Sequence, residues 1–174
     1  MYSKTDCVAI HEAGHALAHI ITGSHFDYVT IKEDNGINKP GQRVLGLTKL
    51  DKPQTNKDWD QFSILNPNEF DRFFKDNFIS ISGYVAETIY RGRSNTKSSK
   101  EDLRQWLYIS LKHLSEQLSS KYISFLLAYA FEVLHKDENW SNIAAIALAL
   151  VDEDTLSYDR VCEVIEQNKQ NPIL

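Results

Sequence analysis

The stretch HEAGHALAH, residues 11–19, constrains this chain more than any other part of its sequence. The surrounding residues 5–22 have the pattern of a helix, which Gly23 can end. In a helix, side chains four positions apart lie one turn apart on the same face, so His11 and His15 present their imidazoles on one side. We therefore expect a helix that directs two ring nitrogens at a common point.

Two imidazoles at this spacing can bind one zinc ion, which prefers nitrogen, sulfur and carboxylate ligands in a tetrahedron. Glu12 follows the first histidine and can take a proton from a water molecule whose pKa the metal lowers. This is the HExxH arrangement of metallopeptidases. Glycine inside a helix costs roughly 1 kcal/mol relative to alanine, so Gly14 indicates that another part of the chain comes close. We prefer this interpretation to a surface helix with two histidines by chance.

His19 and Cys7 lie one turn beyond the histidine pair, in opposite directions along the helix. One metal ion cannot easily bridge three successive turns of a straight helix. We therefore expect His19 to be a structural residue, or to contact the metal ligands without binding the metal itself. Cys7 is expected to be a small buried thiol.

A catalytic zinc site needs a third protein ligand and an open position. The metzincin spacing would place a histidine and a glycine where this chain has Ile21 and Ala18, so that pattern fails. Two acidic candidates remain, Glu87 in GYVAETIYRG and Asp102 in SSKEDL. Each has a plainer alternative, because Glu87 can be a solvated helix residue and Asp102 can favour a helix dipole from the first turn.

Two segments near the zinc helix predict strands, 26–33 and 43–50, which pair as a hairpin around turn residues. Asn66 and Pro67 indicate the start of a helix that runs to about Tyr90. An interruption of that helix is expected near Ser82 and Gly83, and Thr5 or Asp6 is expected to cap the first helix. Further helices are expected at 99–118, 121–136, 139–151 and 155–167.

The predicted fold class is therefore mostly α with a small β-sheet (α+β). The HExxH helix would pack beside a small hairpin-based sheet and a C-terminal helical bundle. With 174 residues and no repeat or linker, one domain over residues 1–174 is expected.

The formal net charge of -5 argues against nucleic acid as the main partner, because phosphate binding needs a basic face. Two cysteines do not make a disulfide framework. The N-terminal residues lack the apolar run of a signal peptide, and the most apolar run, 143–151, is too short to cross a bilayer. A cytoplasmic protein without a membrane segment is expected.

Several segments resemble the peptidase domain of FtsH, the membrane-bound AAA+ zinc protease. In chain order they are HEAGHALAH, DYVTI, VLGLT, GYVAETIYRG, SSKEDL and NIAAIALALVDEDTLSYDRVCEVI. The resemblance touches most of the chain, although residues 105–136 match the family poorly. The G-x-x-AE block followed by the acidic block is more specific than HEAGHA alone.

The resemblance implies a role for each matching residue. His11 and His15 match the zinc histidines, Glu12 the catalytic glutamate and Asp102 the third ligand, while Glu87 would support the site. At the position before Asp102, this chain has glutamate where the family has asparagine.

Gly46 interrupts the second expected strand, and a strand glycine often marks a place where another backbone comes close. We therefore expect Gly46, Leu47 and Thr48, in the matching segment VLGLT, to form an open edge that holds an extended substrate. The alternative is that Gly46 is a bulge in a covered strand.

The sequence thus predicts a zinc metalloendopeptidase that cleaves peptides or unfolded protein segments. No Walker A segment occurs in these residues, so activity without an ATPase of its own is expected. A separate ATPase partner or a homo-oligomer would be compatible with the family, but nothing in the sequence indicates either. The alternative is a catalytically silent binding or adaptor protein of the same fold, which the intact Glu12 disfavours.

Overall fold

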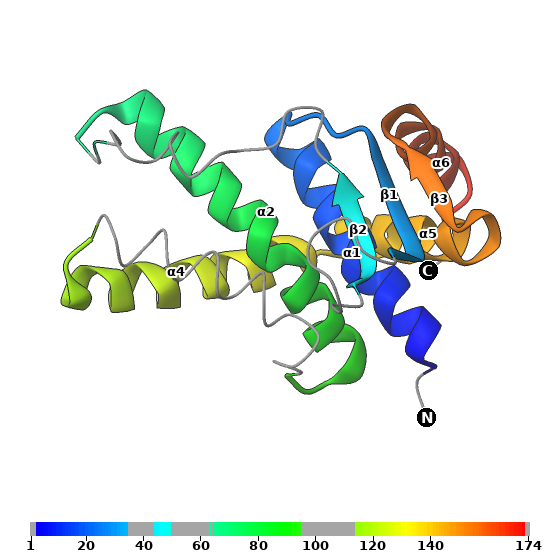
Figure 1. The fold of residues 1–174 in the computed structure, drawn as a ribbon, viewed down its shortest axis with the longest axis horizontal. Coiled ribbons are helices and arrows are strands. Elements are labelled where there is room, and N and C mark those ends of the chain that lie inside the picture. The colour runs from blue at the N-terminus through cyan, green and yellow to red at the C-terminus, as the bar shows by residue number, and fades with distance from the viewer. Residues whose placement is uncertain (1–2, 35–43, 50–62, 64, 95–113, 173–174) are drawn as a thin grey trace.

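The computed structural model describes residues 3–34, 44–49, 63, 65–94 and 114–172 (Figure 1). Its elements follow in the order α1 (Lys4–Thr22), β1 (Tyr28–Asp34), β2 (Val44–Lys49), α2 (Pro67–Arg91), α4 (Glu116–Leu134), α5 (Asp137–Glu153), β3 (Thr155–Ser157) and α6 (Tyr158–Gln170). Long helices make up most of the structure, and one small antiparallel sheet lies beside α1. The expected mostly helical α+β class is confirmed.

Helix α1 has a defined cap at each end. The hydroxyl of Ser3 accepts a hydrogen bond from the backbone N–H of Asp6 at 3.0 Å, so Ser3 is the N-cap rather than Thr5 or Asp6. Gly23 ends the helix with a φ of 69°, in the left-handed region that glycine adopts without strain. The predicted C-terminal end is confirmed, and the N-terminal cap was placed two to three residues too late.

The sheet has the strand order β2–β1–β3, and both pairings are antiparallel. The predicted hairpin is confirmed, since Tyr28 pairs with Lys49 and Thr30 with Leu47. The prediction of a helix from residue 155 was wrong at its start. Residues 155–157 form β3 and pair with β1, because this short segment lies extended beside a strand far away in the sequence.

Helix α2 is continuous, which corrects the expected interruption near Ser82 and Gly83. The Ser82 hydroxyl donates to the carbonyl oxygen of Phe78 at 2.6 Å, one turn back, so it follows the helix instead of breaking it. The predicted start is confirmed. Asn66 caps the helix by accepting from the N–H of Asn68, with Pro67 in the first turn.

The break expected between residues 118 and 121 was also wrong. Helix α4 begins directly after Ser115, whose hydroxyl accepts from the N–H of Leu118 at 3.4 Å. The remainder of the helix predicted at 99–118 lies mostly outside the described residues. Helices α5 and α6 correspond to the last two predicted helices, but α5 extends two residues further at each end, and α6 begins after β3 and ends three residues later than predicted.

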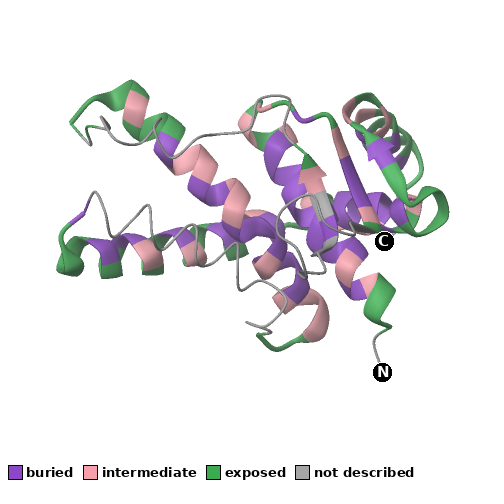
Figure 2. Cartoon of the chain, viewed as in Figure 1, coloured by how far each residue is buried: buried purple, intermediate pink, exposed green. Residues whose placement is uncertain are grey.

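Helix α1 lies at the centre of the molecule and packs against α2, α5 and the first two strands. Figure 2 shows its buried middle turns between these elements. From Ala9 to His19 every residue of α1 is buried, including the polar residues of the HExxH motif. None of the described helices combines the length and the apolar character needed to cross a lipid bilayer. The fold therefore places the histidine pair inside the protein, facing α2.

Candidate metal and catalytic site

The two motif histidines point at each other. The Nε2 atoms of His11 and His15 are 3.1 Å apart, and both residues are 8% exposed. Their rings meet edge to face, with centroids 4.8 Å apart. The expected convergence of two ring nitrogens is therefore present in the structure.

Helix α2 holds the opposite nitrogen of each ring. The Nδ1 atom of His15 is 2.8 Å from the backbone carbonyl oxygen of Ile79. A carbonyl oxygen can only accept, so the proton of His15 lies on Nδ1 and the lone pair of its Nε2 faces His11. The Nδ1 atom of His11 is 3.6 Å from Oε2 of Glu87. Such contacts from the far side are the ones that orient metal-binding histidines.

Glu87 is buried, with 2% of its side chain exposed, so the alternative of a solvated helix residue is wrong. Its second oxygen, Oε1, lies 2.6 Å from Nε of Arg91, one turn later in α2. Nε of Arg91 has no hydrogen-bond partner among the described residues, so we describe this contact as an ion pair. Arg91 compensates the buried carboxylate that contacts His11.

Gly83 of α2 faces the histidine pair. A Cβ atom at this position would lie 2.7 Å from Nε2 of His11 and would also clash with Nε2 of His15. Any larger residue would therefore push into the place where the two nitrogens converge. Glycine was expected here as a helix interruption, but it leaves room beside the imidazoles.

Gly14 brings the two helices together, as the sequence predicted. A Cβ atom there would lie 2.7 Å from the Cβ of Ala86 and 2.7 Å from the backbone oxygen of Ser82. Backbone of α1 therefore packs directly on α2. This close crossing allows Ile79, Gly83 and Glu87 to reach the imidazoles.

The third motif residue, Glu12, faces β2 instead of α2. It is 4% exposed, and its Oε2 accepts a hydrogen bond from the hydroxyl of Thr48 at 3.2 Å. Gly46 has a φ of 89°, and a Cβ atom there would lie 2.5 Å from Oε1 of Glu12. Two of the three residues expected to form the substrate strand thus contact the expected catalytic glutamate. For Leu47, the structure describes the backbone pairing with Thr30.

The expected third ligand, Asp102, lies outside the described residues. Within the part of the chain that the structure describes, no group of three His, Cys, Asp or Glu residues is arranged to hold a metal. The described residues thus bring two potential ligand atoms together, the Nε2 atoms of His11 and His15. Glu87 approaches His11 at Nδ1, on the side away from the paired Nε2 atoms, which suits a supporting residue better than a ligand.

The two neighbours of the pair along α1 have structural surroundings. His19 is 4% exposed and packs against the ring of Phe26 at a centroid distance of 5.4 Å. Burial, followed by the nearby His15 and His25, lowers the pKa of His19 to about 4. Cys7 is buried as expected, and this burial raises the pKa of its thiol.

Sequence reasoning missed Gly83 as a site residue and Arg91 as the partner of Glu87. The predicted helix ended at about Tyr90, one residue short of Arg91, which is the last residue of α2. The spacing of four residues between Glu87 and Arg91 was the available signal, since such a pair meets on a helix. Nothing in the sequence indicated that Gly83 faces the histidines.

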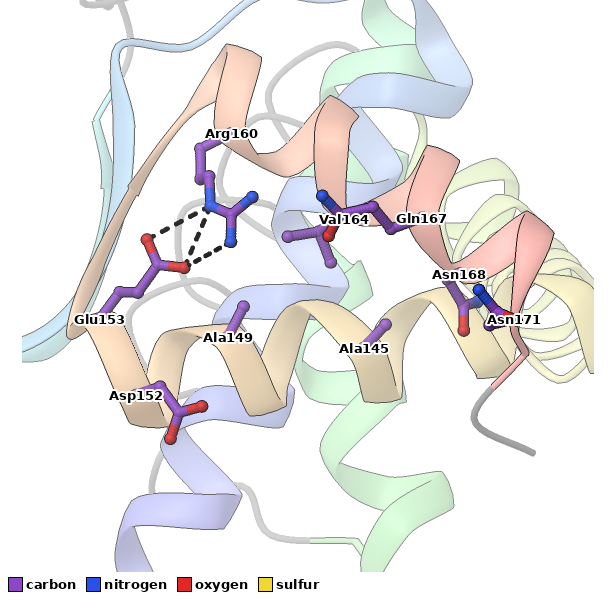
Figure 3. A pocket seen from close by; sticks show the side chains of 9 residues that line it. All are labelled: Ala145, Ala149, Asp152, Glu153, Arg160, Val164, Gln167, Asn168 and Asn171. Carbon is purple, nitrogen blue, oxygen red and sulfur yellow. Dashed lines mark hydrogen bonds and ion pairs between the residues drawn. The ribbon is translucent and has the colours of Figure 1, made fainter.

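A surface pocket lies elsewhere, between α5 and α6 (Figure 3). Its lining includes Arg160, Glu153 and Asn168. The Nη2 atom of Arg160 donates a hydrogen bond to Oε1 of Glu153 at 2.8 Å. No residue of the HExxH helix lines it. The pocket is thus separate from the histidine pair.

A comparison with protein-family models finds no match for the chain, and a comparison with curated proteins finds no significantly similar sequence.

Proposed function

We propose that the protein is a zinc-dependent metallopeptidase that cleaves peptides or unfolded protein segments. The observation that carries this proposal is the pair of Nε2 atoms 3.1 Å apart. A proton fixed on Nδ1 of His15 leaves the Nε2 lone pair directed at His11. Glu87 favours the same arrangement in His11. The two rings are also within hydrogen-bond distance of each other at Nε2, but with both protons on Nδ1 the two Nε2 lone pairs would be satisfied by a shared cation.

The donor set fits zinc. Imidazole nitrogens are common zinc ligands, and the room left by Gly83 lies against both of them. Asp102, which matches the third ligand in the resemblance to FtsH, would complete the set. A bound zinc ion would supply Lewis-acid chemistry, lowering the pKa of a water molecule and polarising a peptide carbonyl.

Glu12 is the residue that would move the proton. Its carboxylate accepts the Thr48 hydroxyl hydrogen bond and lies against Gly46, so its position is defined by β2. In the proposed reaction, a Glu12 carboxylate oxygen takes the proton of the attacking water and then gives it to the leaving amine. A binding protein that used the metal only structurally would have no need of this base.

Strand β2 would hold the substrate. Among the described strands it pairs with β1 alone, so it is an edge of the sheet. An extended peptide can add to such an edge through backbone hydrogen bonds, which are indifferent to side-chain sequence. Because Gly46 and Thr48 contact Glu12, a peptide bound along this strand would lie near the base.

The resemblance to the FtsH peptidase domain supports the same roles for these residues. In the proposal the protein acts without an ATPase of its own, so its substrates must already be unfolded. The alternative is a silent binding or adaptor protein, and the intact Glu12 with its defined position argues against it.

The test compares casein hydrolysis and zinc content in the parent protein and in Glu12→Gln. Hydrolysis is expected in the parent and is expected to be lost in the variant, while zinc stays bound. Glu138→Gln, at an exposed glutamate on α5, is the matched control and should behave like the parent. If Glu12→Gln cleaves as fast as the parent, the base assignment is wrong. A parent that binds zinc without cleaving unfolded proteins would indicate the silent binding protein.

A further inference from the structure

Helix α4 has two different faces. Its buried face packs toward the core through Ser119, Tyr122, Leu126, Ala130 and Leu134. A second set of residues recurs at alternating spacings of three and four, and all of them are exposed. This stripe comprises Leu118, Lys121, Phe125, Ala128 and Glu132 of α4, followed by its C-cap residue His135. Such spacing is that of the a and d positions along which two helices pack together.

The stripe carries apolar surface that the described core leaves uncovered. Phe125 is 57% exposed and Leu118 is 47% exposed, and Tyr129 and Phe131 border the stripe at 37% and 36%. Of the nine large hydrophobic residues exposed in the described part of the chain, these four lie on α4. The rings of Phe125 and Tyr129 also contact Phe74 of α2, so part of each is packed and part faces solvent. Scattered apolar residues are normal on a surface, but two on the stripe and two beside it, all on one helix, indicate a contact surface.

The stripe is complementary to itself when a second α4 runs antiparallel to the first. A two-fold axis between Phe125 and Ala128 places each phenylalanine opposite the small alanine of the other helix. The same axis places Lys121 opposite Glu132, and Leu118 opposite His135. In antiparallel helix pairs an a position faces a d position, and all three pairings obey that rule. A two-fold interface needs this self-complementarity.

We propose that the chain forms a two-fold symmetric homodimer through antiparallel packing of α4 against α4 of a second copy. At the centre, each Phe125 fills the space beside the small Ala128 of the other copy. The two Lys121–Glu132 pairs favour the antiparallel orientation of the two helices. Exposed ion pairs add only about 0–1 kcal/mol each, so they act on orientation more than on strength. In a parallel pairing, Lys121 would face Lys121 of the second copy and Glu132 would face Glu132, so like charges would repel.

The first test measures mass in solution by light scattering over a range of concentrations, up to about 100 µM, because a small interface gives a weak dimer. The parent is expected to approach twice the monomer mass. Phe125→Arg is expected to weaken the dimer at least tenfold. Leu148→Arg, at a residue 54% exposed on α5, is the matched control and should leave the dimer intact. A parent that stays monomeric, or a dimer that Phe125→Arg does not weaken, would overturn the proposal.

The second test uses charge reversal to establish the pairing. Lys121→Glu alone and Glu132→Lys alone each place like charges opposite one another and are expected to weaken the dimer. Mixing these two variants pairs opposite charges at both sites, so a heterodimer is expected. The double variant Lys121→Glu with Glu132→Lys is expected to dimerise like the parent. Failure of both the mixture and the double variant to recover dimer would rule out this register. Circular dichroism of each variant checks that it is folded.

Discussion

Glu87 contacts His11 at Nδ1, at 3.6 Å, and not at the Nε2 atom that faces His15. The glutamate lies on α2 and the histidine on α1, so this contact links two helices across the buried centre of the protein. A carboxylate behind an imidazole raises its basicity and fixes the ring orientation. The two acidic residues considered as third ligand can therefore be separated by experiment.

Asp102→Ala is expected to abolish stoichiometric zinc binding, because it removes a proposed ligand atom. Glu87→Gln is expected to keep zinc but to bind it about 10- to 100-fold more weakly, since it removes a charge that supports His11. Competition with a zinc-binding dye measures both affinities. Full zinc retention in Asp102→Ala combined with complete loss in Glu87→Gln would reverse the assignment.

Gly83→Ala is expected to weaken zinc binding at least tenfold. The added methyl group would lie 2.7 Å from Nε2 of His11, so the imidazoles must move apart from their present positions. Alanine has the better helix propensity by roughly 1 kcal/mol, so backbone preference does not explain such a loss. Ser82→Ala, at the neighbouring position of the same helix, is the control and should retain zinc. Parent-like zinc affinity in Gly83→Ala would show that the room beside the imidazoles is not needed.

Gly46→Ala is expected to slow casein hydrolysis while zinc remains bound. The substitution strains a residue at a φ of 89° and places a methyl group 2.5 Å from Oε1 of Glu12. Gly23→Ala is a matched control, because Gly23 has a φ of 69° and a Cβ atom there would meet nothing within 4 Å. Backbone strain at positive φ is expected to cost both variants about 1 kcal/mol of stability, and the contact with Glu12 adds to that loss in Gly46→Ala, which alone should lose activity. Equal hydrolysis rates in the two variants would contradict a role for β2 beside Glu12.

His19 is expected to make the stability of the protein depend on pH. Its pKa is lowered to about 4 by burial in the folded protein, against about 6.5 when unfolded, so the unfolded state binds the proton more readily. The free energy of unfolding should therefore fall as the pH drops from about 6.5 to 4, by up to roughly 3 kcal/mol. His19→Leu removes this dependence.

Urea denaturation of the zinc-free protein across that pH range measures the effect of His19 without interference from metal release. The difference in stability between the parent and His19→Leu should change with pH below about 6.5 and stay constant above it. A difference that is constant throughout would show that His19 does not titrate in this way.

Local signals in the sequence were sufficient for the ends of several elements. Gly23 marks the end of α1, and Asn66 with Pro67 marks the start of α2, because capping chemistry depends on adjacent residues. The three residues of β3 were missed because so short a segment has no readable periodicity. Its partner, β1, lies far away in the sequence.

In the candidate site, too, the local features were predictable from the sequence and the long-range contacts were not. The spacing of His11 and His15 placed both rings on one face of one helix, which is a local property. The contact of Glu87 with His11 and the room beside Gly83 depend on how α2 crosses α1. That crossing arises from tertiary packing, and no short-range pattern encodes it.

The pairing of β3 with β1 has a consequence for the order in which the chain can fold. The hydroxyls of Thr30 and Thr155 are 2.7 Å apart, although 125 positions separate them in sequence. The β1–β2 hairpin can form once Lys49 has left the ribosome, whereas the third strand arrives only after α5 has left it as well. Closing so long a loop slows folding. During translation, the β1 edge that β3 later covers therefore stays open to other strands, which exposes the nascent chain to wrong strand pairing there.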